Sequence, residues 1–319
     1  MALSVDFTED HRIGDEILKG VSDQYRKLRN TFRYLLGALD GYNKENPAHN
    51  GTETQQQPDE LPELERYMLA LLAQLDATLK QAVKDFDYNT YVRALTDFCN
   101  EDLSAFYFDI RKDCLYCDAE SDPKRIAYRF VLDTLFHALI RYAAPVLVFT
   151  AEEVWGTRFP DGGSVHLLEW PVLPGADATL TTPLAATSPR HPREGGDPAA
   201  SDVAGTSGTP DQVRGDELVE KWAAVRDQRM LANERIEPLR REKVIGSSLE
   251  AEYFYEGDPG DVDLAEIFIV AAVHKGPTDV KPTTHHKCGR CWRHLPEVTE
   301  DGALCSRCDQ VVAGMDAAA

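Results

Sequence analysis

Two closely spaced pairs of cysteines near the end of the chain constrain its fold more than any other feature. Thirteen residues separate the pairs, so each Cys-x2-Cys turn can present two thiolates and the loop between them can close around one tetrahedral ion. Four thiolates leave no open coordination position, so we predict one structural Zn2+ ion and no catalytic metal. The segment is too short to bury a core of its own, and metal binding should fold it. The predicted ligands are Cys288, Cys291, Cys305 and Cys308.

The remaining cysteines and neighbouring histidines give weaker signals. Cys114 and Cys117 share the spacing but have no second pair nearby, so we expect packed or surface cysteines, with a further metal or redox site as the alternative. We expect His285 and His286 to face solvent or RNA. Cysteines in this pattern indicate a reducing compartment, and we expect a cytoplasmic protein. No run of about eighteen apolar residues predicts a membrane span, and the N-terminus does not resemble a secretory signal.

The first half of the sequence has the periodicity of amphipathic helices. Apolar residues recur three and four positions apart, as on the buried face of a helix. Long helices of this kind with modest connections predict an antiparallel bundle, which we place at residues 1–175. The predicted helices cover about residues 17–39, 64–83, 91–107, 123–140 and 146–155.

The second half changes composition twice. Residues 176–213 are dominated by Pro, Gly, Ser, Thr and Ala, which predicts a flexible linker or insertion. Residues 214–280 read as a small α+β module, with a basic helix over Glu217–Lys243 and strands over Glu252–Tyr255 and Ile267–Val273. Residues 281–319 form the predicted zinc finger and tail. The predicted fold class is therefore mainly α: a helical bundle, an α+β module and a four-cysteine zinc finger.

Basic residues are concentrated locally although the formal net charge is −20. Residues 24–34 and 281–296 contain several cations and no acid, a distribution that favours selective docking of an anion such as RNA. Ordinary solvated surfaces are the alternative. Trp292 could stack on an unpaired base or pack against the α+β module. The candidate RNA contacts are Lys27, Arg29, Arg290, Trp292 and Arg293.

Catalytic patterns are absent from the sequence. We find no nucleophile elbow, Walker loop or dinucleotide fingerprint. Glu152 and Glu153 suit capping or packing better than acid–base chemistry. We therefore predict no catalytic residue.

Taken together, several segments resemble the bacterial-type isoleucyl-tRNA synthetase family of class I, from just after its catalytic signature to its C-terminus. The resemblance covers nearly the whole chain except about residues 184–213, which we interpret as an insertion. It implies zinc on the four cysteines, contact of Arg290 and Trp292 with the tRNA anticodon region, and Arg29 as a weaker contact. The segments that carry it are SVDFTEDHRIGDEILKGVSDQYRKLRNTFRYLLGALDGY, YFDIRKDCLYCD, APVLVFTAEEVW, SVHLLEWP, VRDQRMLANERIEPLRREKVIGSSLEAE and KCGRCW with LCSRC.

The same resemblance defines what we do not expect of this chain. The whole family enzyme joins isoleucine to its tRNA using ATP, with H-x-G-H and K-M-S-K-S type signatures that do not occur here. We expect Met1 to correspond to an internal methionine, and the catalytic and editing domains to lie outside this chain. The chain should bind isoleucine tRNA as a monomer, partner the catalytic domain, and be inactive alone. The alternatives are the equivalent part of a valyl- or leucyl-type enzyme, or a stand-alone interaction protein built from a helical bundle and a zinc ribbon.

Overall fold

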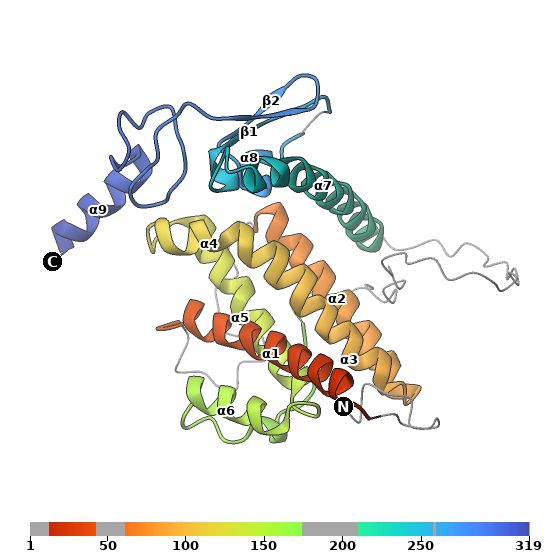
Figure 1. Cartoon of the computed structure of the whole chain (residues 1–319). Helices are drawn as coiled ribbons and strands as arrows, with labels where there is room; N and C mark the ends of the chain where they lie inside the picture. The colour runs from red at the N-terminus through yellow and green to blue at the C-terminus, as the bar shows by residue number, and fades with distance from the viewer. Residues whose placement is uncertain (1–12, 43–60, 174–209, 258–259, 319) are drawn as a thin grey trace, which may run out of the picture. The chain divides into compact units, whose positions relative to one another are not determined.

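The computed structural model describes residues 13–42, 61–173, 210–257 and 260–318 (Figure 1). By internal contacts the chain divides into two compact units. The described part of the first contains residues 13–42, 63–100, 131–173 and 210–219, and that of the second contains residues 61–62, 101–130, 220–257 and 260–318. The predicted linker at 176–213 lies outside the described residues except for its last four, which begin a helix. The four-part division predicted from composition stays a prediction.

Helices build the first unit, as the apolar periodicity predicted. Its elements are α1 (Asp15–Ala38), α2 (Glu63–Lys84), α3 (Tyr88–Asp97), the larger part of α5 (Pro123–Ala143) and α6 (Val148–Arg158). The residues of the three-four pattern form the core, because they share one face of each helix. The most deeply buried include Phe32, Leu35, Met68, Leu72, Leu79, Phe136 and Trp155.

A carboxylate in the core of the first unit collects several donors. The Tyr142 hydroxyl donates to Asp76 Oδ1 at 2.7 Å, and Trp170 Nε1 donates to the same atom at 2.6 Å. Lys80 Nζ lies 2.7 Å from the other oxygen. These partners satisfy a carboxylate that would otherwise be costly to bury.

The second unit combines helices with a three-stranded sheet. Residues 101–130 supply most of a π-helical segment (Phe98–Tyr107) and α4 (Phe108–Cys117), and α7 (Pro210–Arg241) follows later in the chain. The sheet order is β2-β1-β3, with β1 (Ala251–Tyr255) parallel to β2 (Ala272–Lys275) and antiparallel to β3 (Asp279–Pro282). The chain ends in α9 (Ser306–Ala318). The predicted fold class, mainly helical with a small α+β part and a four-cysteine cluster, is confirmed.

The strand predicted at Ile267–Val273 is wrong over most of its length. Leu264–Phe268 forms a short helix, α8, and β2 begins only at Ala272 (Figure 1). The Asp263 side chain accepts a hydrogen bond from the Glu266 amide at 3.1 Å and caps the helix. Ile269 ends it in a left-handed conformation with φ of 56°. Ile267, which contributed to the strand prediction, lies instead on this helix and is buried with Leu264 and Phe268.

The basic helix predicted at Glu217–Lys243 is present as α7, but two of its arginines are occupied within the second unit. Arg226 pairs with Asp102. Arg229 is buried, and it donates hydrogen bonds to the Asp109 carboxylate at 2.6 Å and to the Ile267 carbonyl at 2.6 Å. These cations therefore hold α7, α8 and residues 101–110 together and do not face a ligand. None of the described helices is long and apolar enough to cross a membrane.

Candidate metal centre and nucleic-acid interface

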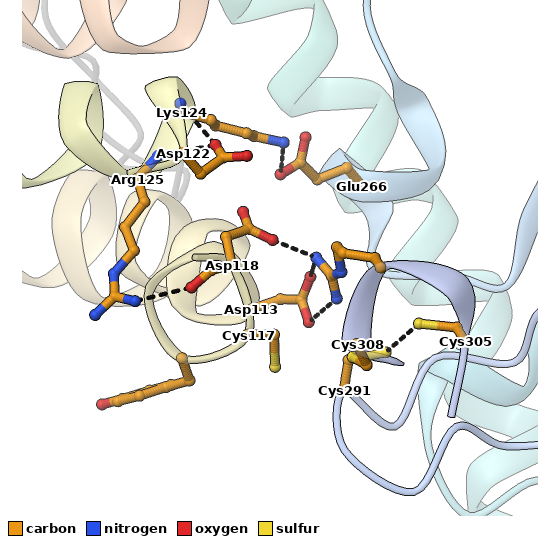
Figure 2. Close-up of polar contacts among 12 residues, drawn as sticks. Asp113, Cys117, Asp118, Asp122, Lys124, Arg125, Glu266, Cys291, Cys305 and Cys308 are labelled. Carbon is orange, nitrogen blue, oxygen red and sulfur yellow. Dashed lines mark hydrogen bonds and ion pairs between the residues drawn. The ribbon is translucent and has the colours of Figure 1, made fainter. Parts of the chain in front are cut away.

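The four predicted zinc ligands come together in the second unit. Their Sγ atoms all lie within 4.8 Å of one another, and all four residues are buried. The Sγ atoms of Cys291 and Cys305 are 3.9 Å apart (Figure 2), which matches the edge of about 3.8 Å that Zn–S bonds of about 2.3 Å give a tetrahedron. Within the described residues, this is the one group of three or more His, Cys, Asp or Glu side chains gathered closely enough to hold a metal ion.

Backbone hydrogen bonds shape each cysteine pair into a tight turn. The Trp292 amide donates to the Cys288 carbonyl at 3.0 Å, and the Asp309 amide donates to the Cys305 carbonyl at 2.9 Å. The Cys305 amide also donates to Cys288 Sγ at 3.3 Å, so the second turn helps to stabilise the charge of the first. These two turns, with the loop between them, are called here the four-cysteine module (residues 287–309).

A glycine inside the first turn allows the two halves of the module to approach. A Cβ atom at Gly289 would lie 2.4 Å from the Gly302 carbonyl oxygen, which is backbone and cannot swing away. Gly302 itself has a φ of +95°, a conformation that strains other residues. The Cys-Gly-x-Cys sequence is therefore required by geometry as well as by metal spacing.

The electrostatics of the thiols fit a divalent cation. Burial raises the pKa of Cys288, but hydrogen bonds from the amides of Cys291, Arg290 and Cys305 outweigh it and lower that pKa to about 6. Burial raises the pKa of Cys291 to about 12 and that of Cys308 to about 11. Four buried thiolates would repel one another, and a bound cation would supply the compensating charge that stabilises all four in the thiolate form.

In each cysteine turn, the arginine just before the second cysteine attaches the four-cysteine module to the C-terminal end of α4. Arg290 donates to the carbonyl oxygens of Tyr116 and Cys117, where helical carbonyls have no partner within the helix. Arg307 donates to Asp113 at 2.7 and 3.0 Å and to Asp118 at 2.9 Å. The sequence singled out Arg290 as an RNA contact, and no signal in it identified Arg307 as an anchor.

The other two cysteines of interest are buried thiols beside the module. Burial raises the pKa of Cys117 to about 12 and also raises the pKa of Cys114, so both stay protonated. Cys117 packs against the four-cysteine cluster without joining the group of four. His286 lies 3.4 Å from Asp301, and the ring of His294 contacts the His285 carbonyl at 2.7 Å. The partner of His286 is thus a carboxylate of the module, and the partner of His294 is a backbone carbonyl just before the module.

The candidate RNA contacts lie on two surfaces, one in each unit. In the first unit, Lys27 and Arg29 are exposed on α1. In the second, Trp292 is 62% exposed, and Lys287 Nζ lies 5.2 Å from its ring centroid. Arg293, next to it, is half-buried. The exposure of Trp292 disfavours the alternative in which it packs into the α+β part.

The helical part of the chain is similar to a known protein family. Residues 65–190 match the family model described as the anticodon-binding domain of tRNA ligase. This part of the chain is therefore similar to the anticodon-binding domains of tRNA ligases, and the four-cysteine module follows it in the sequence.

Comparison with individual proteins gives a narrower result. The chain is 49% identical to an isoleucine–tRNA ligase of Zymomonas mobilis subsp. mobilis, over 97% of this chain and 30% of that protein. It is 41% identical to the isoleucine–tRNA ligase of Gluconobacter oxydans (97% and 30%) and 36% identical to that of Agrobacterium fabrum (94% and 29%). The chain spans about 30% of the length of these curated relatives. Over nearly its whole length it is therefore homologous to one segment of the isoleucine–tRNA ligases.

Proposed function

We propose that this chain is the tRNA-binding region of an isoleucine–tRNA ligase and that it holds the anticodon region of isoleucine tRNA. The observation that carries the proposal is the similarity of 97% of the chain to isoleucine–tRNA ligases, together with an anticodon-binding domain inside it. In the whole enzyme, ATP-dependent joining of isoleucine to tRNA belongs to the parts of the ligase that this chain does not match. The partner of this chain is the catalytic part of the ligase, and the proposed ligase acts as a monomer in the cytoplasm.

The metal in this proposal is zinc, and its role is structural. Cys288, Cys291, Cys305 and Cys308 would hold it, since thiolates in a closed set of four are the ligands that structural zinc prefers. When bound, the ion supplies the cross-link that a module without a large core needs in order to fold. The side chains around the ion then do the binding: Arg290 and Arg307 fix the module on α4, and Trp292 remains exposed.

The proposed RNA contacts divide by chemistry. Trp292 offers a flat ring on which an unpaired base can stack. Arg293, and the charge of Arg290 beside it, attract the phosphate backbone. Lys27 and Arg29 on α1 supply phosphate contacts from the first unit. Among these, Arg290 already binds two carbonyl oxygens, so its part in RNA binding is through its charge.

Binding of transcripts of isoleucine and valine tRNA to the zinc-loaded chain tests the proposal. The chain should prefer isoleucine tRNA, and Trp292→Ala should weaken binding by about 1–3 kcal/mol, the usual value of one base–aromatic stack. Trp292→Phe, which keeps a ring, is the matched control. Cys305→Ser should lower both zinc content and tRNA affinity. Equal affinity for the two tRNAs, unaffected by Trp292→Ala, contradicts the proposal.

The assignment of ligation to other parts of the enzyme has its own assay. We expect this chain alone to show no isoleucine-dependent exchange of pyrophosphate into ATP, because no catalytic pattern occurs in its sequence. Exchange above background by the purified chain would show that it holds a catalytic centre of its own.

A further inference from the structure

The turn between α2 and α3 holds an exposed aromatic ring in a strained backbone conformation. α2 ends in two backbone hydrogen bonds, from the Phe86 amide to the Val83 carbonyl at 3.3 Å and from the Asp87 amide to the Ala82 carbonyl at 2.9 Å. This helix ending requires a left-handed residue at position 86, where glycine is the usual residue. Phe86 occupies that position with a φ of 57° and is 66% exposed. The first unit therefore keeps a strained residue whose ring it mostly leaves in water.

Neighbouring apolar side chains extend this exposed surface. Tyr88, the first residue of α3, makes an edge-to-face contact with the Phe86 ring, with centroids 6.4 Å apart, and is itself exposed. Val83, on the last turn of α2, is also exposed. Large apolar side chains that gather on a surface mark a contact with another molecule or another part of the same protein.

The N-terminal half of α1 has the same character. Its apolar stripe continues along the whole helix, but only the C-terminal half, with residues such as Leu28 and Phe32, is buried in the first unit. Ile17 and Leu18, near the other end, are exposed. α1 packs against α3, and the N-terminal end of α1 and the α2–α3 turn lie at the same end of the bundle (Figure 1). The bundle-end surface is defined here as Ile17, Leu18, Val83, Phe86 and Tyr88.

The charges around the bundle-end surface disfavour RNA as its occupant. Residues 15–19 and 83–88 contain four carboxylates and two lysines. This balance repels phosphate groups, whereas the candidate RNA contacts of α1, Lys27 and Arg29, lie further along the helix. An apolar centre with a charged rim is instead typical of contacts between folded parts of proteins.

The same charges disfavour a second copy of this chain. In a symmetric dimer the bundle-end surface would face itself, so Asp15, Glu16 and Asp85 would meet their own copies. Like charges placed opposite each other weaken association, particularly in a chain with a net charge of −20. The rest of the ligase is a better occupant, because the chain matches about 30% of relatives in which that segment belongs to one polypeptide. Covalent linkage gives such a partner a high effective concentration.

We propose that the bundle-end surface docks the first unit onto the catalytic part of the ligase, with Phe86 as the side chain that inserts into that part. The inference rests on the proposed function and adds to it the surface that joins tRNA binding to catalysis. Strained residues persist where a functional contact uses them, which accounts for a phenylalanine at a glycine position. Docking fixes the place of the bound tRNA relative to the catalytic centre, and such positioning is a large part of catalysis between two substrates.

The chain alone gives the first test. Phe86→Gly should not lower the urea midpoint, because glycine adopts this conformation without strain and most of the lost ring lies in water. Its affinity for isoleucine tRNA should also stay unchanged. Lys243→Gly, which replaces a left-handed residue with a φ of 58° in the second unit, is the matched control for strain. A lower midpoint for Phe86→Gly would show that the ring serves the fold, and a lower tRNA affinity would show that the turn contacts RNA; either result overturns the inference.

A chimaeric ligase gives the second test. In it, this chain replaces the matching 30% of the Zymomonas mobilis ligase. Hydroxyl-radical labelling of the Phe86 and Tyr88 rings should fall severalfold in the chimaera relative to the chain alone, because rings in an interface are excluded from solvent. Labelling of Tyr116, an exposed ring of the second unit, should be equal in both and is the internal reference.

Aminoacylation by the chimaera shows whether the contact matters for function. Phe86→Gly should lower kcat/KM for tRNA about tenfold, a usual loss when one anchoring aromatic is removed, whereas Phe86→Tyr, which keeps the ring, should preserve it. Isoleucine-dependent pyrophosphate exchange should be the same in all three proteins, because exchange requires no tRNA.

The outcomes separate the docking inference from the proposed function. Equal labelling in the chimaera and the chain alone, with full aminoacylation by Phe86→Gly, overturns the inference and leaves the proposed function standing. A dimer of the unaltered chain that Phe86→Gly abolishes assigns the surface to a second copy and overturns the inference as well. Failure of the unaltered chain to bind isoleucine tRNA is instead a failure of the proposed function.

Discussion

Replacement of Arg307 by alanine should loosen the four-cysteine module from α4. The guanidinium makes three charge-assisted hydrogen bonds, two to Asp113 and one to Asp118, at 2.7–3.0 Å. The Arg307 side chain is 33% exposed, that of Asp113 is 30% exposed and that of Asp118 is 8% exposed. The burial of this ion pair is therefore intermediate between that of a solvent-exposed pair and that of a buried pair.

The expected loss of stability follows from this intermediate burial. Exposed pairs contribute about 0.2–1 kcal/mol, and removing one partner of a buried pair costs about 3–5 kcal/mol. For bidentate geometry and partial burial we expect Arg307→Ala to lower the free energy of unfolding of the second unit by about 2 kcal/mol. With a urea dependence of about 2 kcal/mol per molar, the midpoint should fall by about 1 M.

Urea titration of the zinc-loaded chain, followed by release of zinc to a chromogenic chelator, measures this change. A double-mutant cycle with Asp113→Ala should show a coupling of about 1–2 kcal/mol, because the two side chains are in direct contact. Arg240→Ala is the matched control, since Arg240 forms an exposed pair with Glu237 at 3.3 Å and should shift the midpoint little. A midpoint change no larger than that of Arg240→Ala, with additive double mutants, refutes the anchoring role of Arg307.

Two further predictions concern the same unit. Gly289→Ala should weaken zinc binding at least tenfold in a competition titration, because the new Cβ would lie 2.4 Å from the Gly302 carbonyl oxygen. Gly314→Ala is the control and should leave zinc affinity unchanged, since Gly314 has open space around it. Equal zinc affinity of the two variants contradicts the steric argument. Glu266 has its pKa lowered, since Arg111 and Lys124 outweigh the opposing effect of burial, so its contribution to stability is present above the unfolded pKa and is lost as the pH falls through the lower folded value. Urea unfolding at several pH values should therefore show Glu266→Gln less stable than the unaltered chain at neutral pH, with the difference shrinking below about pH 4.5, and a pH-independent difference opposes this reasoning.

The sequence predicted the helices and the clustering of the four cysteines because both depend on local patterns. Apolar residues spaced three or four positions apart, such as Phe32 and Leu35, form the core of the first unit. Residues with this spacing share one face of a helix, so the pattern itself identifies the buried face. The two cysteine pairs specify their own turns through the Cys-x2-Cys spacing. The grouping of four sulfur atoms within 4.8 Å thus needed no information beyond the sequence.

Other features depend on contacts between residues distant in the sequence. The run at Ile267–Val273 has the composition of a strand, but a cap at Asp263 and the pairing of β1 with β2 after Ala272 turn its first part into helix. The pairing of Arg307 with Asp113 joins residues 194 positions apart, and no spacing rule connects them. The cavity of about 520 Å3 lined by Tyr116, Arg290 and Arg293 depends on α4, α8 and the four-cysteine module, which are far apart in the sequence, so no local pattern predicts it.

The two arginines in the cysteine turns show why Arg290 is a poor residue with which to test RNA recognition. Four thiolates with one divalent cation bound would keep a net negative charge, and Arg290 approaches Cys308 Sγ at 3.7 Å while it binds the end of α4. Its removal would disturb the metal centre, the docking of the module and the field of the cavity at once. Arg293 lines the same cavity with no carboxylate partner in the described residues, so its removal changes mainly the charge at the opening. In a chain with a net charge of −20, such a locally uncompensated cation favours selective docking of an anion over general attraction to nucleic acid.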